Sequence, residues 1–337
     1  MINKIVFSII LFIIILSLSQ IFMLGSNIIG INEYAINLSK NIIFNIIPFF
    51  YIYGCSSPIL YSGIYKKTNK VDIVICNHIT NLDFGIVSSI IRKFDDRNIY
   101  VVYQKEVIYI PYLGSFSSKK DIGMHFNKAD KNIDNIKTIL SYIENGIILI
   151  MPEGNVSSTK LKIKSNNYCS TNNLHIFKNT LYPKIKGLWT IYITLTEMNK
   201  MGNIIDMSIV IENFYKKQIT ILDLLTKDFG NTFVKIVTLE KTNLNNYIDF
   251  KKWFISKWII KDEILETMLI NKYNILYPVK NTKYYAFLIY IIILFVTMSN
   301  TFLIIISTII SSSLILYRNT PDINTLFKFI YNLLYER

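Results

Sequence analysis

A short, mostly apolar run, Val71–Cys76, passes directly into the polar heptad NHITNLD at residues 77–83, and this junction strongly constrains the fold. An apolar run of this length, bounded by polar residues, is typical of a buried strand. The residues after the heptad, Phe84–Lys93, are predicted to form a helix. The junction therefore predicts a strand, a turn and a helix, which is the unit that α/β domains repeat.

The same alternation continues through the centre of the chain. Ala129–Glu144 predicts a second helix, because its isoleucines and leucine recur at helical spacing. Alternating strands and helices indicate the α/β class. We expect strands at Val71–Cys76, Asn98–Tyr103, Gly146–Met151, Thr180–Tyr182 and Asp206–Ile211.

From Asp223 to Lys272 the pattern becomes helical and charged. Within it, Trp253–Trp258 reads as an amphipathic helix. Two surfaces are open to such a helix, because its apolar face can rest either on a membrane or on the domain itself.

His78 and Asp83 make the heptad a candidate for chemistry. The chain has only three histidines, and this one directly follows a strand, at the edge where α/β sheets hold their reactive groups. A neutral imidazole can take a proton from a hydroxyl, and a carboxylate can fix its tautomer and stabilise the imidazolium. Residues five apart do not meet on a helix, so a turn must bring them together, with Asn81 as a plausible helix N-cap. An isolated H-x4-D also occurs by chance in unrelated proteins.

The composition favours a membrane protein with an anionic partner. Hydrophobic residues make up 51% of the 337 residues and charged residues only 18%, yet the net charge is +13. This combination suggests membrane attachment together with attraction to lipid headgroups or phosphorylated ligands. Nucleic acid is not expected as a partner, because no nucleic-acid motif is present and the hydrophobic segments would be superfluous. The scattered cysteines Cys55, Cys76 and Cys169 indicate neither a disulfide framework nor a zinc site.

Three apolar stretches are candidates for contact with a bilayer. Ile5–Leu24 has twenty residues without a charge, long enough to cross a hydrocarbon core, and we favour an uncleaved anchor over a signal peptide. Ile42–Tyr65 contains prolines and glycine, so it is expected to be a kinked span, a re-entrant segment or an interfacial segment. Tyr284–Tyr317 has 34 uncharged residues and a polar centre, which suggests a helical hairpin. The lysine-rich centre is expected on the cytosolic side.

Three further segments follow the heptad in order. They are Lys105–Gly114, Ile150–Asn155 and Leu181–Gly187. Together with Asn77, His78 and Asp83 they resemble, in order and spacing, the 1-acylglycerol-3-phosphate acyltransferases, a family of glycerolipid acyltransferases. The W-x2-K-D-E-x-L pattern within Phe254–Glu266 is similar to the region that follows the catalytic domain in this family.

The resemblance covers about residues 66–270. Within the family, Lys164-Ser165-Asn166 and Pro183–Gly187 look most like the lysocardiolipin acyltransferase-like branch. The implied fold is an α/β domain of the glycerol-3-phosphate acyltransferase type, flanked by transmembrane or interfacial helices. The implied division is a membrane anchor region at 1–65, an acyltransferase domain at 66–222, a helical extension at 223–283, a transmembrane hairpin at 284–317 and a cytosolic tail at 318–337.

The resemblance implies a reaction as well. His78 would act as general base on the free hydroxyl of a lysophospholipid, with Asp83 orienting it, and the oxygen would attack the thioester of acyl-CoA. Acyl-CoA is a co-substrate, and no metal or other cofactor is implied. The implied substrate-binding residues are Asn77, Lys105, Gly114, Glu153, Gly154, Pro183 and Lys184. Several have plainer alternatives, since Gly114 can simply turn the chain and the lysines can face water.

Two departures from the family pattern concern the phosphate. The Thr-Arg pair that follows Glu-Gly in the family is Asn155-Val156 here, and Lys128 stands where a second arginine is usual. Either a lysine such as Lys160, Lys162 or Lys164 takes the arginine's role, or the acceptor headgroup differs. A membrane protein that keeps the fold and binds lipid without turnover is therefore a rival, whereas a transporter would need polar groups inside its spans.

The expected location is an internal membrane, the endoplasmic reticulum or a host equivalent, with the catalytic domain facing the cytosol. The acceptor headgroup, the acyl-chain preference, the number of membrane crossings and the oligomeric state are left open by the sequence.

Overall fold

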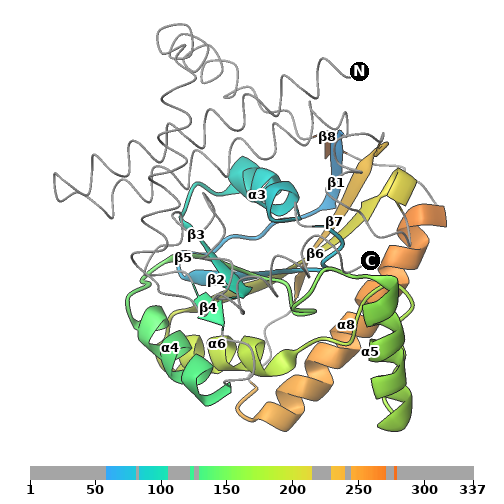
Figure 1. Ribbon diagram of the computed structural model, residues 1–337. Coiled ribbons are helices and arrows are strands. Elements are labelled where there is room, and N and C mark those ends of the chain that lie inside the picture. The colour runs from blue at the N-terminus through green and yellow to red at the C-terminus, as the bar shows by residue number, and fades with distance from the viewer. Residues whose placement is uncertain are drawn as a thin grey trace, which may run out of the picture.

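A computed structural model describes residues 58–80, 83–104, 122–124, 129–214, 229–239, 244–270 and 277–278. In this part of the chain a sheet is covered by helices on both faces (Figure 1). The strands are β1 (Ile59–Gly63), β2 (Val71–Cys76), β3 (Ile99–Gln104), β4 (Ile122–Met124), β5 (Gly146–Ile150), β6 (Met201–Ile211), β7 (Thr232–Leu239) and β8 (Tyr277–Pro278).

The sheet has the order β4-β3-β5-β2-β6-β7-β1-β8. Strands β4, β3, β5, β2 and β6 all run parallel to one another, whereas β7 is antiparallel to β6. Strand β1 is parallel to β7, and β8 is antiparallel to β1. Because β2 and β5 are parallel neighbours, the loops after both strands emerge at the same edge of the sheet.

Successive residues of β2 serve two separate cores. Val74 and Cys76 pack against α3 (Asp83–Phe94) on one face. Ile73 and Ile75 lie in the opposite core, which is formed with α4 (Ala129–Ser141), α6 (Ile185–Glu197) and α8 (Tyr247–Ile270). The other helices are α5 (Thr159–Thr171) and the short 3-10 helix η4 (Glu212–Phe214). This alternation explains why the strand sequence is apolar on both faces.

The predicted α/β class is confirmed, and so are the strand at Val71–Cys76 and the helix after the heptad. The strand predicted at Gly146–Met151 is also present and ends one residue earlier, at Ile150. Of the two surfaces expected for Trp253–Trp258, the structure shows the domain, because Phe254 and Trp258 are buried in the second core. The predicted spans Ile5–Leu24 and Tyr284–Tyr317 lie outside the described residues. No helix within the described part is long and apolar enough to cross a bilayer.

The structure differs from the sequence predictions at three places. The apolar stretch Ile42–Tyr65 was expected at the membrane, but its end forms β1, whose side chains are buried in the sheet beside β7. The sheet therefore begins before residue 66 and, through β7, extends past residue 222 into the predicted helical extension. Thr180–Tyr182 forms no strand, because side-chain oxygens of Asp262, Glu153 and Ser165, rather than a neighbouring strand, accept its backbone N–H groups.

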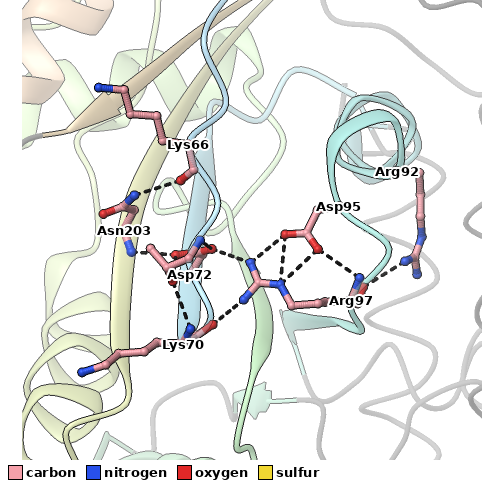
Figure 2. A network of polar contacts seen from close by, with 8 residues as sticks. Lys66, Lys70, Asp72, Arg92, Asp95, Arg97 and Asn203 are labelled. Atoms are coloured by element: carbon pink, nitrogen blue, oxygen red, sulfur yellow. Dashed lines mark hydrogen bonds and ion pairs between the residues drawn. The ribbon is translucent and has the colours of Figure 1, made fainter.

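A network of charges holds the sheet edge opposite the heptad (Figure 2). Asp72 of β2 is fully buried and accepts hydrogen bonds from Thr68 N at 3.0 Å and Asn203 N at 2.7 Å. Arg97 donates to Asp72 and to Asp95, so the carboxylate inside the apolar strand is paired. The guanidinium lowers the pKa of Asp95 against the opposing effect of burial. The network ties the beginning of β2 to β6 and to the loop after α3.

Candidate active site

The polar residues of the heptad gather at the edge where β2 and β5 end. His78 follows β2, Asp83 is the first residue of α3, and Glu153 follows β5. The predicted turn is present, because Asp83 N donates to Thr80 O at 3.2 Å. Asn81, the expected N-cap, lies outside the described residues.

His78 and Asp83 contact one another. Nδ1 of His78 lies 3.0 Å from Oδ2 of Asp83, and the side chains are 19% and 0% exposed. The same Oδ2 accepts the backbone N–H groups of Ile79 at 2.6 Å and Thr80 at 3.0 Å. An ionised carboxylate can only accept, so Nδ1 carries the proton and Nε2 keeps a lone pair. The arrangement can therefore supply a base at Nε2.

Burial raises the pKa of Asp83, while the hydrogen bond and the charge of His78 and the two backbone N–H groups lower it. A buried carboxylate is stabilised most when the neighbouring imidazole takes up a proton and becomes positive. The pair is thus suited to stabilising an imidazolium that forms during a reaction.

Glu153 braces the backbone rather than pointing at open solvent. It is 2% exposed, and its two oxygens accept His78 N and Leu181 N, each at 2.9 Å. Burial raises the pKa of Glu153 to about 7, against the lowering effects of these two N–H groups and of the charges of His78 and Lys261. Glu153 therefore fixes the position of His78 relative to the segment before α6.

Gly154 and Lys184 lie against each other beside this brace. Gly154 has a φ of +70°, and a Cβ added there would lie 3.0 Å from both Cδ and Nζ of Lys184. Lys184 N donates to Pro152 O at 2.7 Å, which joins the two loops. Lys184 is exposed, but the atoms around its ammonium partly shield it from water, which lowers its pKa, and the positive charge of Lys164 lowers the pKa further.

Asn77 and Pro183 were predicted to bind substrate, but both are buried. The Asn77 amide is used by β6, since its Nδ2 donates to Ile209 O at 2.9 Å and its Oδ1 accepts Ile209 N at 2.8 Å. Asn77 thus fixes the point at which the chain leaves the sheet. Lys105, Gly114 and Lys128 lie outside the described residues, so their predicted roles stay predictions.

Three residues near the site were missed by the sequence reasoning. Lys261 and Asp262 are buried in α8, and Asp206 of β6 is the partner of Lys261. The W-x2-K-D-E-x-L pattern contains two of them, and the available signal was a charged pair within an otherwise apolar helical segment. Asp206 lies 55 residues away from Lys261, and no local pattern connects them.

The family model described as Acyltransferase matches residues 62–210, which include His78, Asp83, Glu153, Gly154 and Lys184. These residues form an acyltransferase domain. The family membership predicted from the motifs is confirmed, and so is the prediction that the chain is an acyltransferase.

Among solved structures, a match is the 1-acyl-sn-glycerophosphate acyltransferase of Thermotoga maritima. It has 15% sequence identity and a TM-score of 0.43, and the match covers 74% of this chain and 95% of that one. No curated protein gives a significant match to the sequence. The resemblance to the lysocardiolipin acyltransferase-like branch stays a prediction.

Proposed function

We propose that this acyltransferase transfers the acyl group of acyl-CoA to the free hydroxyl of a lysophospholipid, with His78 as general base. The observation that carries the proposal is the 3.0 Å contact between Nδ1 of His78 and Oδ2 of Asp83, which leaves Nε2 available. The motif resemblance and the matched acyltransferase family support the choice of donor and acceptor.

The proposed reaction uses this geometry. Nε2 of His78 accepts the proton of the lysophospholipid hydroxyl as its oxygen attacks the thioester carbonyl of acyl-CoA. The new C–O bond forms, the C–S bond breaks, and the imidazolium returns its proton to the sulfur of CoA. Asp83 stays ionised throughout and stabilises the positive ring. No covalent intermediate on the protein is needed.

The lysines beside Gly154 supply the anion subsite of the proposal. The family's arginine after Glu-Gly is absent, and the side chain of Lys184 lies along Gly154, next to the brace that holds His78. Tyr182 N donates to Ser165 Oγ at 2.8 Å, so α5 and its Lys164 are tied to the same segment. Burial and the charge of Lys164 lower the pKa of Lys184, and a phosphate bound at the Lys184 ammonium would offset both effects.

The hydrophobic ends of the chain support a membrane location. Both the acyl chain and the lysophospholipid are amphiphiles, so a catalytic domain held at a bilayer meets its substrates where they reside. The proposed location is an internal membrane such as the endoplasmic reticulum or a host equivalent, with the domain on the cytosolic side.

The test is acyl transfer from labelled oleoyl-CoA in membranes that contain the full chain, with a panel of lysophospholipids. The wild type should acylate at least one acceptor, and His78→Ala should lose about 10²–10⁴-fold in rate. His175→Ala is the matched control, because His175 is exposed and packs beside Phe177, and it should retain activity. Transfer that survives His78→Ala would overturn the assignment of the base.

Lys184→Met should raise the KM for the lysophospholipid more than it lowers kcat. Absence of transfer to every acceptor, with folded and membrane-bound protein, would favour a lipid-binding role without turnover.

A further inference from the structure

The helix α8 lies outside the residues that match the acyltransferase family, yet one of its charged side chains is fully buried. Lys261 is 0% exposed, and it is the one fully buried basic side chain in the part of the chain that the structure describes. Removing an ammonium from water is costly unless its charge and its donors are satisfied. The position therefore calls for an explanation beyond helix packing.

The ammonium of Lys261 lies at the same sheet edge as His78. It donates to the carboxylate of Asp206 and to Met207 O at 2.8 Å, and it lies 5.0 Å from the centre of the Trp258 ring. Met207 pairs with Cys76, which comes two residues before His78. In Figure 1, α8 lies on the same side of the sheet as α4 and α6, opposite α3. A positive charge is thus placed beside the last residue of β2, from which the loop that carries His78 begins.

The next residue, Asp262, holds the segment that leads to α6. Its carboxylate accepts the backbone N–H groups of Lys178, Asn179 and Thr180 at 2.8, 2.8 and 3.0 Å. Trp258 Nε1 donates to Leu181 O at 3.3 Å. The next residue after Thr180, Leu181, donates its N–H to Glu153, so hydrogen bonds link α8 through this segment to the carboxylate that holds His78.

We propose that Lys261 and Asp262 are positioning residues for acyl transfer, which act through Glu153 on the backbone that carries His78. Asp262 places the N–H of Leu181, and Lys261 supplies the buried positive charge that lets Glu153 stay a carboxylate with two accepting oxygens. The inference rests on the proposed function, because it assumes that His78 is the base.

The charges around Glu153 explain why a cation is needed. The acidic groups at this edge are Asp83 from α3 and Asp206 from β6, and the buried thiol of Cys76 lies among them. The basic groups are His78 and Lys261, both of which lower the pKa of Glu153, with the Lys184 side chain over the adjacent Gly154. A protonated Glu153 would have a hydroxyl where it now accepts a backbone N–H, which weakens the brace.

The experiment measures acyl transfer by the full chain from pH 5.5 to 9.5, with labelled oleoyl-CoA and the acceptor that the wild type uses. The main variant is Asp206→Asn/Lys261→Met, which removes both charges of the ion pair and so leaves neither charge buried without its partner. We expect the acid limb of the kcat/KM profile to move up by about one pH unit, with activity recovered at high pH. Loss by the same factor at every pH would overturn the proposal.

Two comparisons separate this role from a general loss of structure. Asp72→Asn removes a buried carboxylate at the other end of β2 and should lower stability without moving the limb. Lys261→Arg keeps a positive charge at the site and should leave the limb in place. If the limb moves in Lys261→Arg, the proposal is wrong, and this variant decides the matter if the double variant does not fold.

A third comparison tests the route. In a Glu153→Gln background, replacing Asp206 and Lys261 should not move the acid limb further, because the carboxyl group whose pKa Lys261 is proposed to lower is gone. An equal shift in that background would mean that Lys261 acts on His78 without Glu153. Inactive wild-type protein would refute the proposed function itself, whereas active wild-type protein with an unmoved limb in the double variant would refute only this inference.

Discussion

At the scale of one residue, a single oxygen of Asp83, Oδ2, accepts hydrogen bonds from the ring of His78 and from two backbone N–H groups. This concentration of donors holds together two side chains that are five positions apart and could not meet on a regular helix. The N–H groups also keep a buried carboxylate ready to stabilise a positive ring. Orientation and electrostatics are therefore supplied by the same atom.

Asp83→Asn should lower kcat by about 10²–10⁴-fold with little change in KM. The amide carries no charge to stabilise the imidazolium, and its NH2 group favours the wrong tautomer of His78. Steady-state transfer assays check this, with Asp134→Asn on the exposed face of α4 as the control that keeps wild-type kcat. A kcat for Asp83→Asn equal to that of the wild type would contradict the assigned role.

Glu153 makes stability depend on pH with a defined sign. Its pKa is about 7 in the folded protein against an ordinary value of 4.5, so the folded state binds this proton more tightly. The stabilisation is complete below pH 4.5 and is lost as the pH rises through 7. Relative to Glu153→Gln, the wild type should lose on the order of 3 kcal/mol between pH 4 and 8.

Melting temperatures of the two proteins in detergent at several pH values measure this difference. Parallel melting curves across the pH range would show that Glu153 does not titrate there.

At the scale of elements, α8 combines a packing role with a polar one. Phe254 and Trp258 stack at 5.5 Å between ring centres and fill the core beneath β2 and β6. One turn later, Lys261 contacts β6 near the catalytic edge, and Asp262 binds the backbone of the segment before α6. An element outside the matched family residues is thus part of both the core and the site.

Phe254→Ala should destabilise the protein by about 3–5 kcal/mol, because it removes a fully buried ring and leaves a cavity. Ile260→Ala on the same helix should change stability by less than about 0.5 kcal/mol, since Ile260 is 48% exposed. Thermal or denaturant unfolding of the full chain measures both. Equal losses for the two variants would mean that α8 is not packed as described.

In the described part of the whole molecule, two groups of charged side chains lie at opposite edges of the sheet. Asp72, Asp95 and Arg97 lie at the start of β2 and tie the strand to its neighbours (Figure 2). His78, Asp83 and Glu153 lie beyond its other end. Six residues of strand place these two groups of charges roughly 20 Å apart, so they are expected to act independently.

Arg97→Met should therefore lower the free energy of unfolding by about 3 kcal/mol, because Asp72 would be left buried without its cation. The rate per folded molecule and its pH profile should not change. Unfolding measurements and transfer assays on the same preparation test both halves. A shift in the pH profile would show that the two edges are coupled.

The sequence alone was sufficient wherever the physics is local. The buried strand Val71–Cys76, the turn that brings Asp83 to His78 and the helix that follows all depend on residues close together in the chain. The motif order was also enough to indicate the acyltransferase family. Local hydrogen bonding and hydrophobic periodicity act over a few residues, so a linear pattern can report them.

Only the tertiary structure decided the partners of buried polar groups. Thr180–Tyr182 looks like a strand, but its N–H groups go to Asp262 and Ser165, and Leu181 between them serves Glu153. Ile59–Gly63 looks like a membrane segment, yet it pairs with a strand that begins at Thr232. In each case the deciding contact joins residues far apart in sequence. The sequence of a segment shows that its apolar side chains must be buried and that its backbone N–H groups need acceptors. Which residues bury them and accept from them depends on how the whole chain folds.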